Sequence, residues 1–351
     1  MVERSTIYEV ARRSGVSTAT VSRVMDNGTG FSATTRERVR AAARELGWVP
    51  SGSARGLAKR RAGIVGLLFP DLSSEGEADA ESPLYVDQVI RGAERAATAA
   101  GDAVLIAATR GATGRDLAFS VAGKVDGLVV LARSLSDEDL AAIAATIPVL
   151  LLADRSPHGV DRVGVDNRGG MRAVVEHLIT VHGHRDLVFV AGPPRSPDSI
   201  ERFAGFRAAL TAAGLTPPKK PHAQGGFTEH GGARAVRQLL AERERPDAVV
   251  CGNDEMAIGA LAALRDARLK VPADTAVTGF DDITSTRHVT PPITTVRQPM
   301  RELGEQAVRA VLARIVARDA PTHQIVLPTE LVVRRSCGCR STATPRRGKQ
   351  G

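Results

Sequence analysis

The 351-residue chain is 43% hydrophobic and carries a formal net charge of +8, so it is long enough for two or three domains with substantial cores. It has no apolar run near the roughly 20 residues that span a bilayer. Its N-terminus is charged and amphipathic, unlike a secretory signal. We therefore expect a cytoplasmic protein without a membrane partner.

The cysteines and histidines do not predict a metal site. Cys337 and Cys339 would supply only half of a four-ligand zinc site, and no histidine or third cysteine lies near them in sequence. Cys251 is the only other cysteine, and three cysteines do not make a framework of disulfides. The histidines are scattered along the chain, at His158, His177, His182, His184 and His230 among other positions. We expect free thiols, no metal, no catalytic histidine and no cofactor.

The stretch from Thr6 to Met25 is typical of two short helices joined by a tight turn. Thr6 is a suitable N-cap for the first helix, and Gly15 allows the left-handed conformation that ends it. Ser17 then caps a second helix that begins at Thr18. This spacing predicts a helix-turn-helix, with the second helix as the recognition helix.

The second helix has two different sides at about 3.6 residues per turn. Its inner side can pack on the first helix and consists of Thr20, Val21, Val24 and Met25. Its outer side presents groups that reach base edges in a major groove, from Thr18, Ala19, Ser22 and Arg23. The alternative is an ordinary helical hairpin with Arg23 in solvent. Charge favours the DNA-binding interpretation, because residues 1–62 carry a net +7 of the +8 total.

A third helix and a linker follow. Ser32 predicts an N-cap for a helix that ends at Leu46 and completes a three-helix headpiece. In the linker, Pro50 can start a helix but Gly52 and Gly56 weaken it. We expect this segment to be disordered when it is free and helical when a binding partner holds it.

The middle of the chain alternates short apolar runs with helical stretches, which predicts two βαβ series and hence two doubly wound lobes. The first series has expected strands at 64–69, 102–107, 126–131 and 148–153, and helices at 84–100, 114–123 and 136–145. The second has expected strands at 186–191, 222–226, 247–251 and 276–280, and helices at 167–181, 199–213, 229–241 and 255–267. Ligands of such folds bind at the carboxyl ends of the strands.

Polar side chains follow several of these strands. They are Asp71, Asp154, Asn253, Asp281 and, early in a helix, Arg202. Carboxylates, an amide and a guanidinium suit a neutral polyhydroxylated ligand, and Phe227 offers an apolar face to a sugar ring. Asp254 and Asp282 are better explained as cap or turn residues.

The enzyme interpretation has little support. Asp281 and Asp282 are neighbours on an extended segment, so they would point apart instead of flanking one bond. The sequence has no Walker A motif, no G-x-S-x-G and no H-E-x-x-H. A transport binding protein is a further alternative, but the basic headpiece argues against it.

The run VSTATVSRV, the V-P-x-x-x-A-x-x-L linker and the α/β region beyond resemble the LacI/GalR family of bacterial transcriptional repressors, from about Ser5 to about Cys337. The resemblance implies an α/β fold class: a small all-α helix-turn-helix headpiece and two doubly wound parallel-sheet lobes like those of periplasmic binding proteins. The chain would cross between the lobes three times. Residues 299–318 would return to the first lobe and 324–333 to the second.

The resemblance also implies roles for individual residues. Thr18, Ala19 and Arg23 fall where the family reads bases. The positions that touch phosphates are Thr6, Ser17, Thr20, Ser22 and Ser32. Ala54 and Leu57 fall in the hinge helix, with Leu57 as the wedge in the minor groove. The effector positions are Tyr85, Asp154, Asp198, Arg202, Phe227, Asn253 and Asp281.

These interpretations define the expected organisation. We expect a headpiece at 1–49, a hinge at 50–62, an effector and dimerisation domain at 63–338 and a disordered basic tail at 339–351. The first lobe would comprise about 63–166 and 296–324, and the second about 167–295 and 325–338. The expected partners are a pseudo-palindromic operator in double-stranded DNA, a second copy of the chain and a small effector, first of all a carbohydrate. A repressor released by its effector is the main hypothesis, and corepression by a purine, nucleoside or sugar phosphate is the alternative.

Overall fold

The computed structural model describes residues 5–25, 28–49, 61–70, 83–109, 114–152 and 160–340. Four residues with predicted roles, Ala54, Leu57, Asp71 and Asp154, lie outside these ranges, as does most of the predicted linker. The chain divides into two compact units, with the boundary between Gly63 and Ile64. Within the described ranges, no helix is long and apolar enough to cross a membrane.

The N-terminal unit contains three helices, α1 (Ile7–Ser14), α2 (Thr18–Met25) and α3 (Ala33–Glu45), where the sequence predicts them. The Thr6 amide donates to the Glu9 carboxylate at 2.6 Å, and Gly15 ends α1 with a φ of 65°. The helices meet in a small core formed by Val10, Ala11, Val21, Val24, Val39, Ala42 and Ala43. A core of this size gives the unit modest stability of its own.

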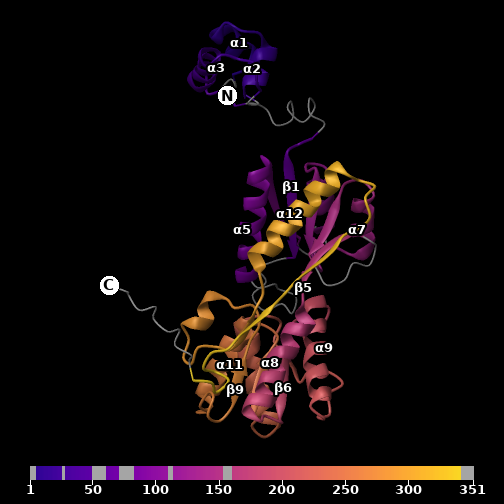
Figure 1. The fold of residues 1–351 in the computed structure, drawn as a ribbon, viewed down its shortest axis with the longest axis vertical. Helices are drawn as coiled ribbons and strands as arrows, with labels where there is room; N and C mark the ends of the chain where they lie inside the picture. The colour runs from indigo at the N-terminus through magenta and orange to yellow at the C-terminus, as the bar shows by residue number, and fades with distance from the viewer. Residues whose placement is uncertain are drawn as a thin grey trace, which may run out of the picture. The chain divides into compact units, whose positions relative to one another are not determined.

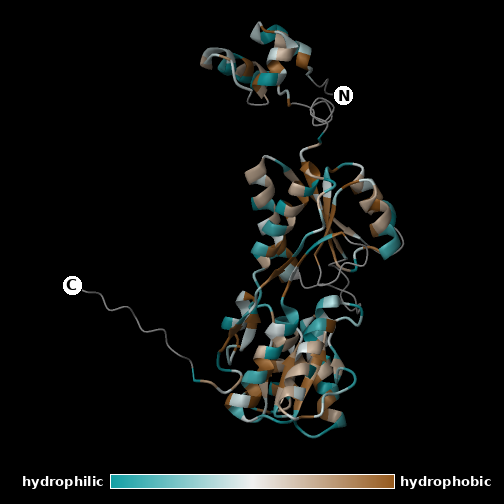
Figure 2. Cartoon of the chain, turned by 45° about the vertical axis from the view of Figure 1, so that its right-hand side comes forward, coloured by the Kyte–Doolittle hydropathy of each residue, from teal (hydrophilic) through white to brown (hydrophobic). Residues whose placement is uncertain are grey.

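The first lobe is built on a six-stranded parallel sheet with the order β11-β5-β4-β3-β1-β2. Its strands are β1 (Ile64–Pro70), β2 (Ala103–Thr109), β3 (Gly127–Leu131), β4 (Val149–Leu152), β5 (Asp161–Val165) and β11 (Gln324–Leu327). Helices α5 (Pro83–Ala100) and α12 (Met300–Val316) cover one face, and α6 (Gly114–Ala122) and α7 (Asp137–Ala144) the other (Figure 1). Hydrophobic segments concentrate in the strands between these layers (Figure 2).

Helices α5 and α12 cross at very short range. A Cβ atom on Gly92 would lie 1.9 Å from the carbonyl oxygen of Arg301, and one on Gly304 would lie 2.1 Å from that of Val89. Only glycine fits at either crossing point, so the return of α12 to the first lobe depends on both. The predicted return of residues 299–318 is confirmed.

The second lobe is built on a four-stranded parallel sheet with the order β7-β6-β8-β9. Its strands are β6 (Leu187–Ala191), β7 (Ala223–Gln224), β8 (Ala248–Cys251) and β9 (Ala276–Thr278). Helices α8 (Asn167–His182) and α9 (Pro197–Ala212) pack on one face, and α10 (Glu229–Glu242) and α11 (Asp254–Asp266) on the other. A short 3-10 helix, η2 (Thr284–Arg287), follows β9.

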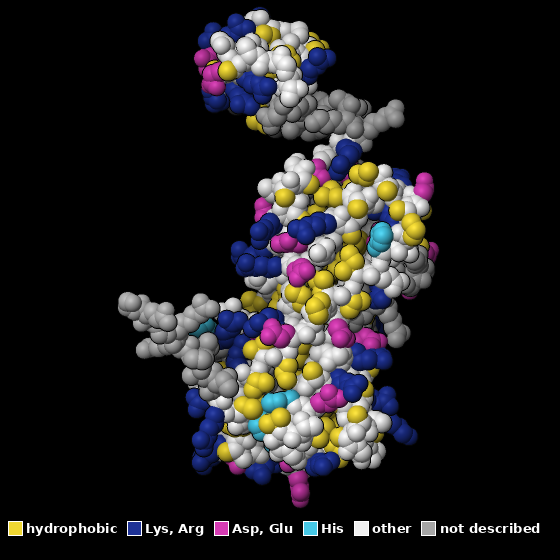
Figure 3. Space-filling model, in the orientation of Figure 1, with side chains coloured by type: hydrophobic (Ala, Val, Ile, Leu, Met, Phe, Trp, Pro, Cys, Tyr) yellow, Lys and Arg dark blue, Asp and Glu magenta, His cyan; other side chains and the backbone are white. Residues whose placement is uncertain are grey.

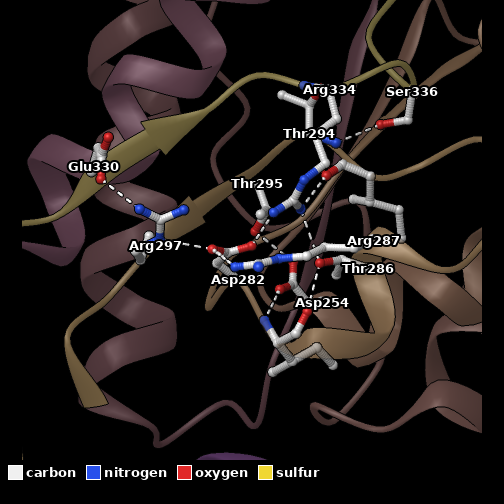
Figure 4. Close-up of polar contacts among 12 residues, drawn as sticks. Asp254, Asp282, Thr286, Arg287, Thr294, Thr295, Arg297, Glu330, Arg334 and Ser336 are labelled. Carbon is white, nitrogen blue, oxygen red and sulfur yellow. Dashed lines mark hydrogen bonds and ion pairs between the residues drawn. The ribbon is translucent and has the colours of Figure 1, made fainter. Parts of the chain in front are cut away.

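The chain passes between the lobes three times, after β5, after β9 and after β11. The last two passages run side by side, because β10 (Thr295–Arg297) pairs antiparallel with β12 (Glu330–Val332). Figure 4 shows a polar network that connects the two passages. Asp282 accepts from Arg297 at 2.8 Å and from Arg334, and Arg297 also donates to Glu330 at 2.9 Å.

Three expectations need correction. The sequence analysis missed β5, and it assigned residues 324–333 to the second lobe, whereas β11 pairs with β5 as an edge strand of the first sheet. The second error follows from the first, because without β5 the sheet has no edge for β11 to join. The predicted disordered tail also starts too early, since Cys339 packs against the core of the second lobe. Residues 341–351 lie outside the described part of the chain.

Candidate functional site

The two sides of α2 differ as the helical wheel predicts. Val21 and Val24 are buried against α1 and α3, whereas Arg23 is exposed on the opposite side. Among the described residues, none accepts a hydrogen bond from the Arg23 guanidinium. Ala19 is also exposed, and Thr18 is half-buried. This side of the headpiece is therefore available for an external partner.

Three of the five hydroxyl residues assigned to phosphate contacts, Thr6, Ser17 and Ser32, lie directly before helices, and Thr20 and Ser22 lie within α2. Ser17 Oγ accepts from the Thr20 amide at 3.2 Å, and Ser32 Oγ accepts from the Thr35 amide at 3.1 Å. Both serines are exposed. A helix N-terminus with exposed donors favours an anion, which suits a DNA phosphate.

A pocket between the lobes brings together six of the seven predicted effector residues. It is lined by Tyr85, Asp198, Arg202, Phe227, Asn253, Asp281 and Gln298. Asp281, Asn253 and Phe227 each follow a strand of the second sheet, and Gln298 follows β10. Because these strands are parallel, their carboxyl ends meet at one edge of the sheet.

Arg202 is the centre of this pocket. Its side chain is 3% exposed, and its guanidinium lies 3.9 Å from the centre of the Phe280 ring. Nε donates to Asn167 Oδ1 at 2.7 Å, and Nη1 donates to the Gly252 carbonyl at 2.8 Å and lies 3.4 Å from Asp281 Oδ1. No described residue accepts from Nη2, which leaves its two donors available.

Asp281 faces Arg202 and is equally buried. Gln298 Nε2 donates to its Oδ1 at 2.6 Å, whereas Oδ2 has no described donor. Burial raises the pKa of Asp281 to about 7, and Arg202 and Gln298 offset only part of that effect. The backbone of Asp281 has a φ of 121°, a conformation that favours glycine, so the loop holds this carboxylate at a conformational cost.

Asn253 and Phe227 hold each other in place. Asn253 Oδ1 caps α11 by accepting from the Met256 amide at 3.0 Å, and Nδ2 donates to the Phe227 carbonyl at 3.0 Å. Phe227 has a left-handed φ of 63°, and its ring packs so closely on Gly192 that a Cβ there would lie 2.2 Å from Cε1. Asn253 therefore positions the aromatic wall of the pocket.

Two residues of the site were missed by the sequence analysis. Gln298 lines the pocket, and its signal was a polar side chain directly after a strand of the lobe crossing. Asn167 bridges Arg202 and Asp198, donating to Asp198 Oδ1 at 3.0 Å. Asn167 is the first residue of α8, and a residue at a helix start reads as a cap in sequence.

Asp254 and Asp282 do not line the pocket. Asp254 accepts from the Ile283 amide at 2.9 Å and from Thr295 at 2.6 Å, and burial raises its pKa well above the ordinary value. Asp282 binds the arginines of the lobe crossing (Figure 4). Both aspartates support the backbone around the site, as the sequence analysis favours.

The pocket between the lobes is narrow. Its free space is about 10 Å³, room for about one water molecule. A larger hollow of about 330 Å³ lies in the first lobe near the end of α12, but its central ion pair, Arg314 to Asp161 at 2.7 Å, is satisfied internally. We therefore place the site by its chemistry, in the narrow pocket, which must widen to admit a ring.

A helix-turn-helix headpiece joined in one chain to a two-lobed domain with a polar pocket defines a ligand-responsive, DNA-binding transcriptional regulator. Residues 6–51 match the family model for bacterial regulatory proteins of the lacI family, and residues 175–337 match that for a periplasmic binding protein-like domain. The chain belongs to the LacI family.

Similar proteins of this family span nearly the whole chain. The HTH-type transcriptional regulator CelR of Thermobifida fusca is 35% identical over 95% of this chain and 98% of its own. The ribose operon repressor of Escherichia coli K12 is 33% identical over 95% and 99%. The structure of the Lac repressor dimer bound to operator and the anti-inducer ONPF matches with a TM-score of 0.81 at 30% identity, over 95% and 99% of the two chains.

Proposed function

We propose that this regulator is a homodimeric repressor that binds a pseudo-palindromic operator and changes its operator affinity when a sugar binds between the lobes. The observation that carries the proposal is that one pocket holds both Arg202 Nη2, from which no described residue accepts, and Asp281 Oδ2, to which no described residue donates. Adjacent hydroxyls of a sugar both donate and accept, so they complement this pair. Tyr85 and Phe227 supply the apolar walls.

The charges of the pocket favour a neutral ligand. Among the described residues that line it, Arg202 is the one cation, and Asp198 and Asp281 are the acids. A sugar phosphate would bring further negative charge, and no second cation among these lining residues would meet it. A relative supports the same ligand class: the structure of CelR in complex with cellobiose matches with a TM-score of 0.71 at 33% identity, over 95% of this chain and 100% of that one.

The proposed mechanism is linkage between the two sites. A sugar needs more room than about 10 Å³, so it binds a different lobe arrangement from the narrow one described above. If operator favours one arrangement and sugar the other, each ligand weakens the other by the same factor. In a dimer, two α2 helices read two half-sites about one helical turn apart. We infer that this occurs in the cytoplasm.

The decisive experiment measures thermal stability against a panel of sugars, sugar phosphates and nucleobases, followed by operator titrations with each ligand that binds. A ligand at 100 times its Kd adds about 2.7 kcal/mol of stability. A sugar that stabilises the wild-type chain and weakens its operator complex supports the proposal. An Arg202→Met variant that still binds that sugar with unchanged affinity would place the site elsewhere.

Corepression by a purine or nucleoside is the second candidate, because PurR of Pectobacterium carotovorum is 33% identical over 95% of this chain and 96% of its own. It predicts that the ligand and operator strengthen each other's binding. The same samples test for catalysis. We propose that the chain is not an enzyme, so the ligand should be recovered unchanged after long incubation with the protein.

A further inference from the structure

Four sulfur and nitrogen ligands meet at the end of α8 that lies away from the pocket. They belong to His177, His182, Cys337 and Cys339, and one ligand atom from each lies within 4.8 Å of all the others. Asn167 begins α8 beside the pocket and His182 ends it, so His177 and His182 lie about 15 Å and about 22 Å along the helix from Asn167. Histidine side chains gather over this part of the second lobe in Figure 3.

The fold positions both halves of the cluster. His177 and His182 lie in the last turns of α8, which Gly183 ends with a φ of 70°. The C-terminal segment is fixed just before the cysteines, because Ser336 Oγ donates to the Val277 carbonyl at 2.5 Å and accepts from the Thr294 amide at 2.8 Å. The thiols are thus presented to the helix by anchored backbone.

Gly338 makes the turn between the two cysteines. Its φ is 107°, which L side chains rarely adopt, and an added Cβ would lie 3.2 Å from the His182 ring. Cys337 is 1% exposed and Cys339 is partly buried. The C-G-C sequence therefore allows both thiols to face the same pair of imidazoles.

Two of the six distances between ligand atoms match a tetrahedral metal site, and all six are within 4.8 Å. Cys339 Sγ lies 3.4 Å from His182 Nε2 and 3.6 Å from His177 Nε2. Ligands on a tetrahedron with Zn–S bonds of about 2.3 Å and Zn–N bonds of about 2.0–2.1 Å lie roughly 3.3–3.8 Å apart. Two thiols and two imidazoles, without a carboxylate, suit zinc and disfavour calcium or magnesium.

We propose that His177, His182, Cys337 and Cys339 bind one structural Zn²⁺ ion. The ion joins α8, which follows the first passage between the lobes, to the C-terminal segment after β12, where the chain has returned to the second lobe. Cys339 and His177 are 162 residues apart, so the bond closes a long loop and stabilises the folded second lobe. All four positions would be occupied by protein, which leaves no open site for catalysis.

The test uses the full-length chain, purified without chelator and with any affinity tag removed. Metal analysis after dialysis should give one zinc ion per chain for the wild type and near zero for Cys339→Ser and for His177→Gln. Both residues are partly exposed, so both variants should fold. His230→Gln is the matched control, because His230 is exposed on α10 of the same lobe, and it should keep its zinc.

Two further measurements separate metal binding from a merely structural role of the side chains. Titration of the metal-free chain with Co²⁺ should produce the visible bands and thiolate charge transfer of a tetrahedral site, and Cys339→Ser should lose them. A chelator should lower the Tm of the wild type and of His230→Gln but not that of Cys339→Ser. Wild-type protein without stoichiometric zinc and without the Co²⁺ spectrum, or zinc retained in both ligand variants, overturns the proposal.

Discussion

The two candidate recognition surfaces of this chain, the exposed side of α2 and the pocket between the lobes, are built in opposite ways. On α2, Arg23 is exposed and Ala19 beside it is exposed as well, so these side chains contribute little to folding. In the pocket, Arg202 and Asp281 are each 3% exposed and are bound to one another and to their neighbours. A substitution on α2 should therefore change binding alone, whereas a substitution in the pocket should change binding and stability together.

The largest effect is expected from Arg202→Met. The substitution leaves Asp281 buried without its cation and leaves the Gly252 carbonyl without its donor. At pH 8, above the Asp281 pKa of about 7, removing one partner of this buried ion pair costs about 3–5 kcal/mol. Urea unfolding should show this loss, and sugar binding should disappear. Arg207→Met is the matched control, because Arg207 is exposed on the same helix and should lose much less stability. Equal loss in the two variants would contradict the central role of Arg202.

The next effect is the pH dependence of stability due to Asp281. Its pKa of about 7 in the folded chain exceeds the ordinary 3.8, so the folded state holds a proton that the unfolded state has lost. Stability should therefore fall as pH rises from about 4 to about 7, by roughly 2–4 kcal/mol, and then level off. Asp281→Asn stays neutral and should lack this fall.

The comparison with Asp281→Asn removes the contribution of the titrating histidines. His184 and His222 have pKa values lowered by burial, which makes stability rise with pH in the acid range. Both histidines are present in both proteins, so they cancel in the difference in unfolding free energy between wild type and variant. That difference reports Asp281 together with Asp254, whose pKa is raised by burial and by the charge of Asp281. A difference that is constant between pH 4 and 8 would show that Asp281 does not hold a proton in the folded chain.

A smaller effect is expected from Gly192→Ala. The new Cβ would lie 2.2 Å from Phe227 Cε1, so the ring that forms the aromatic wall must move. Overpacking of this kind costs about 1–3 kcal/mol, and sugar affinity should fall as well. Thermal unfolding and ligand titration measure the two losses. Gly123→Ala is the control, since its Cβ meets its nearest atom at an ordinary 3.7 Å. If Gly192→Ala matches this control in both assays, Phe227 does not depend on Gly192.

The sequence predicted features that depend on local spacing. The helix-turn-helix follows from its caps, from Gly15 and from one apolar face. The pocket residues Asn253 and Asp281 could be found because each follows an apolar strand, and parallel strands end at one edge. The strand β5 was missed because the segment DRVGV is short, carries two charges and contains a glycine. Because β5 was missed, β11 was wrongly assigned to the second lobe.

Features that join distant segments could not be predicted in this way. Cys337 and Cys339 have no histidine near them in sequence. The fold nevertheless brings His177 and His182 to them, although His177 and Cys339 are 162 residues apart in the chain. Gln298 belongs to the pocket only because the lobe crossing carries it there. These arrangements are set by tertiary topology, which apolar periodicity describes only in outline.

The smallest effect on stability is expected from Arg23→Ala. This variant tests most directly whether the exposed side of α2, unlike the buried pocket, contributes to binding without contributing to folding. The side chain is exposed and has no acceptor among the described residues, so the unfolding free energy should change by less than about 0.5 kcal/mol. Operator affinity should fall by about 1–3 kcal/mol, and the preference for one base pair should be lost. Titrations against operators altered at single positions measure this change in affinity and preference.

The control is Arg12→Ala, because Arg12 is also exposed in the headpiece but lies on α1. This substitution should weaken binding to all sequences alike. Equal loss of affinity for every operator in Arg23→Ala would assign Arg23 to a phosphate and would leave base reading to Thr18 and Ala19.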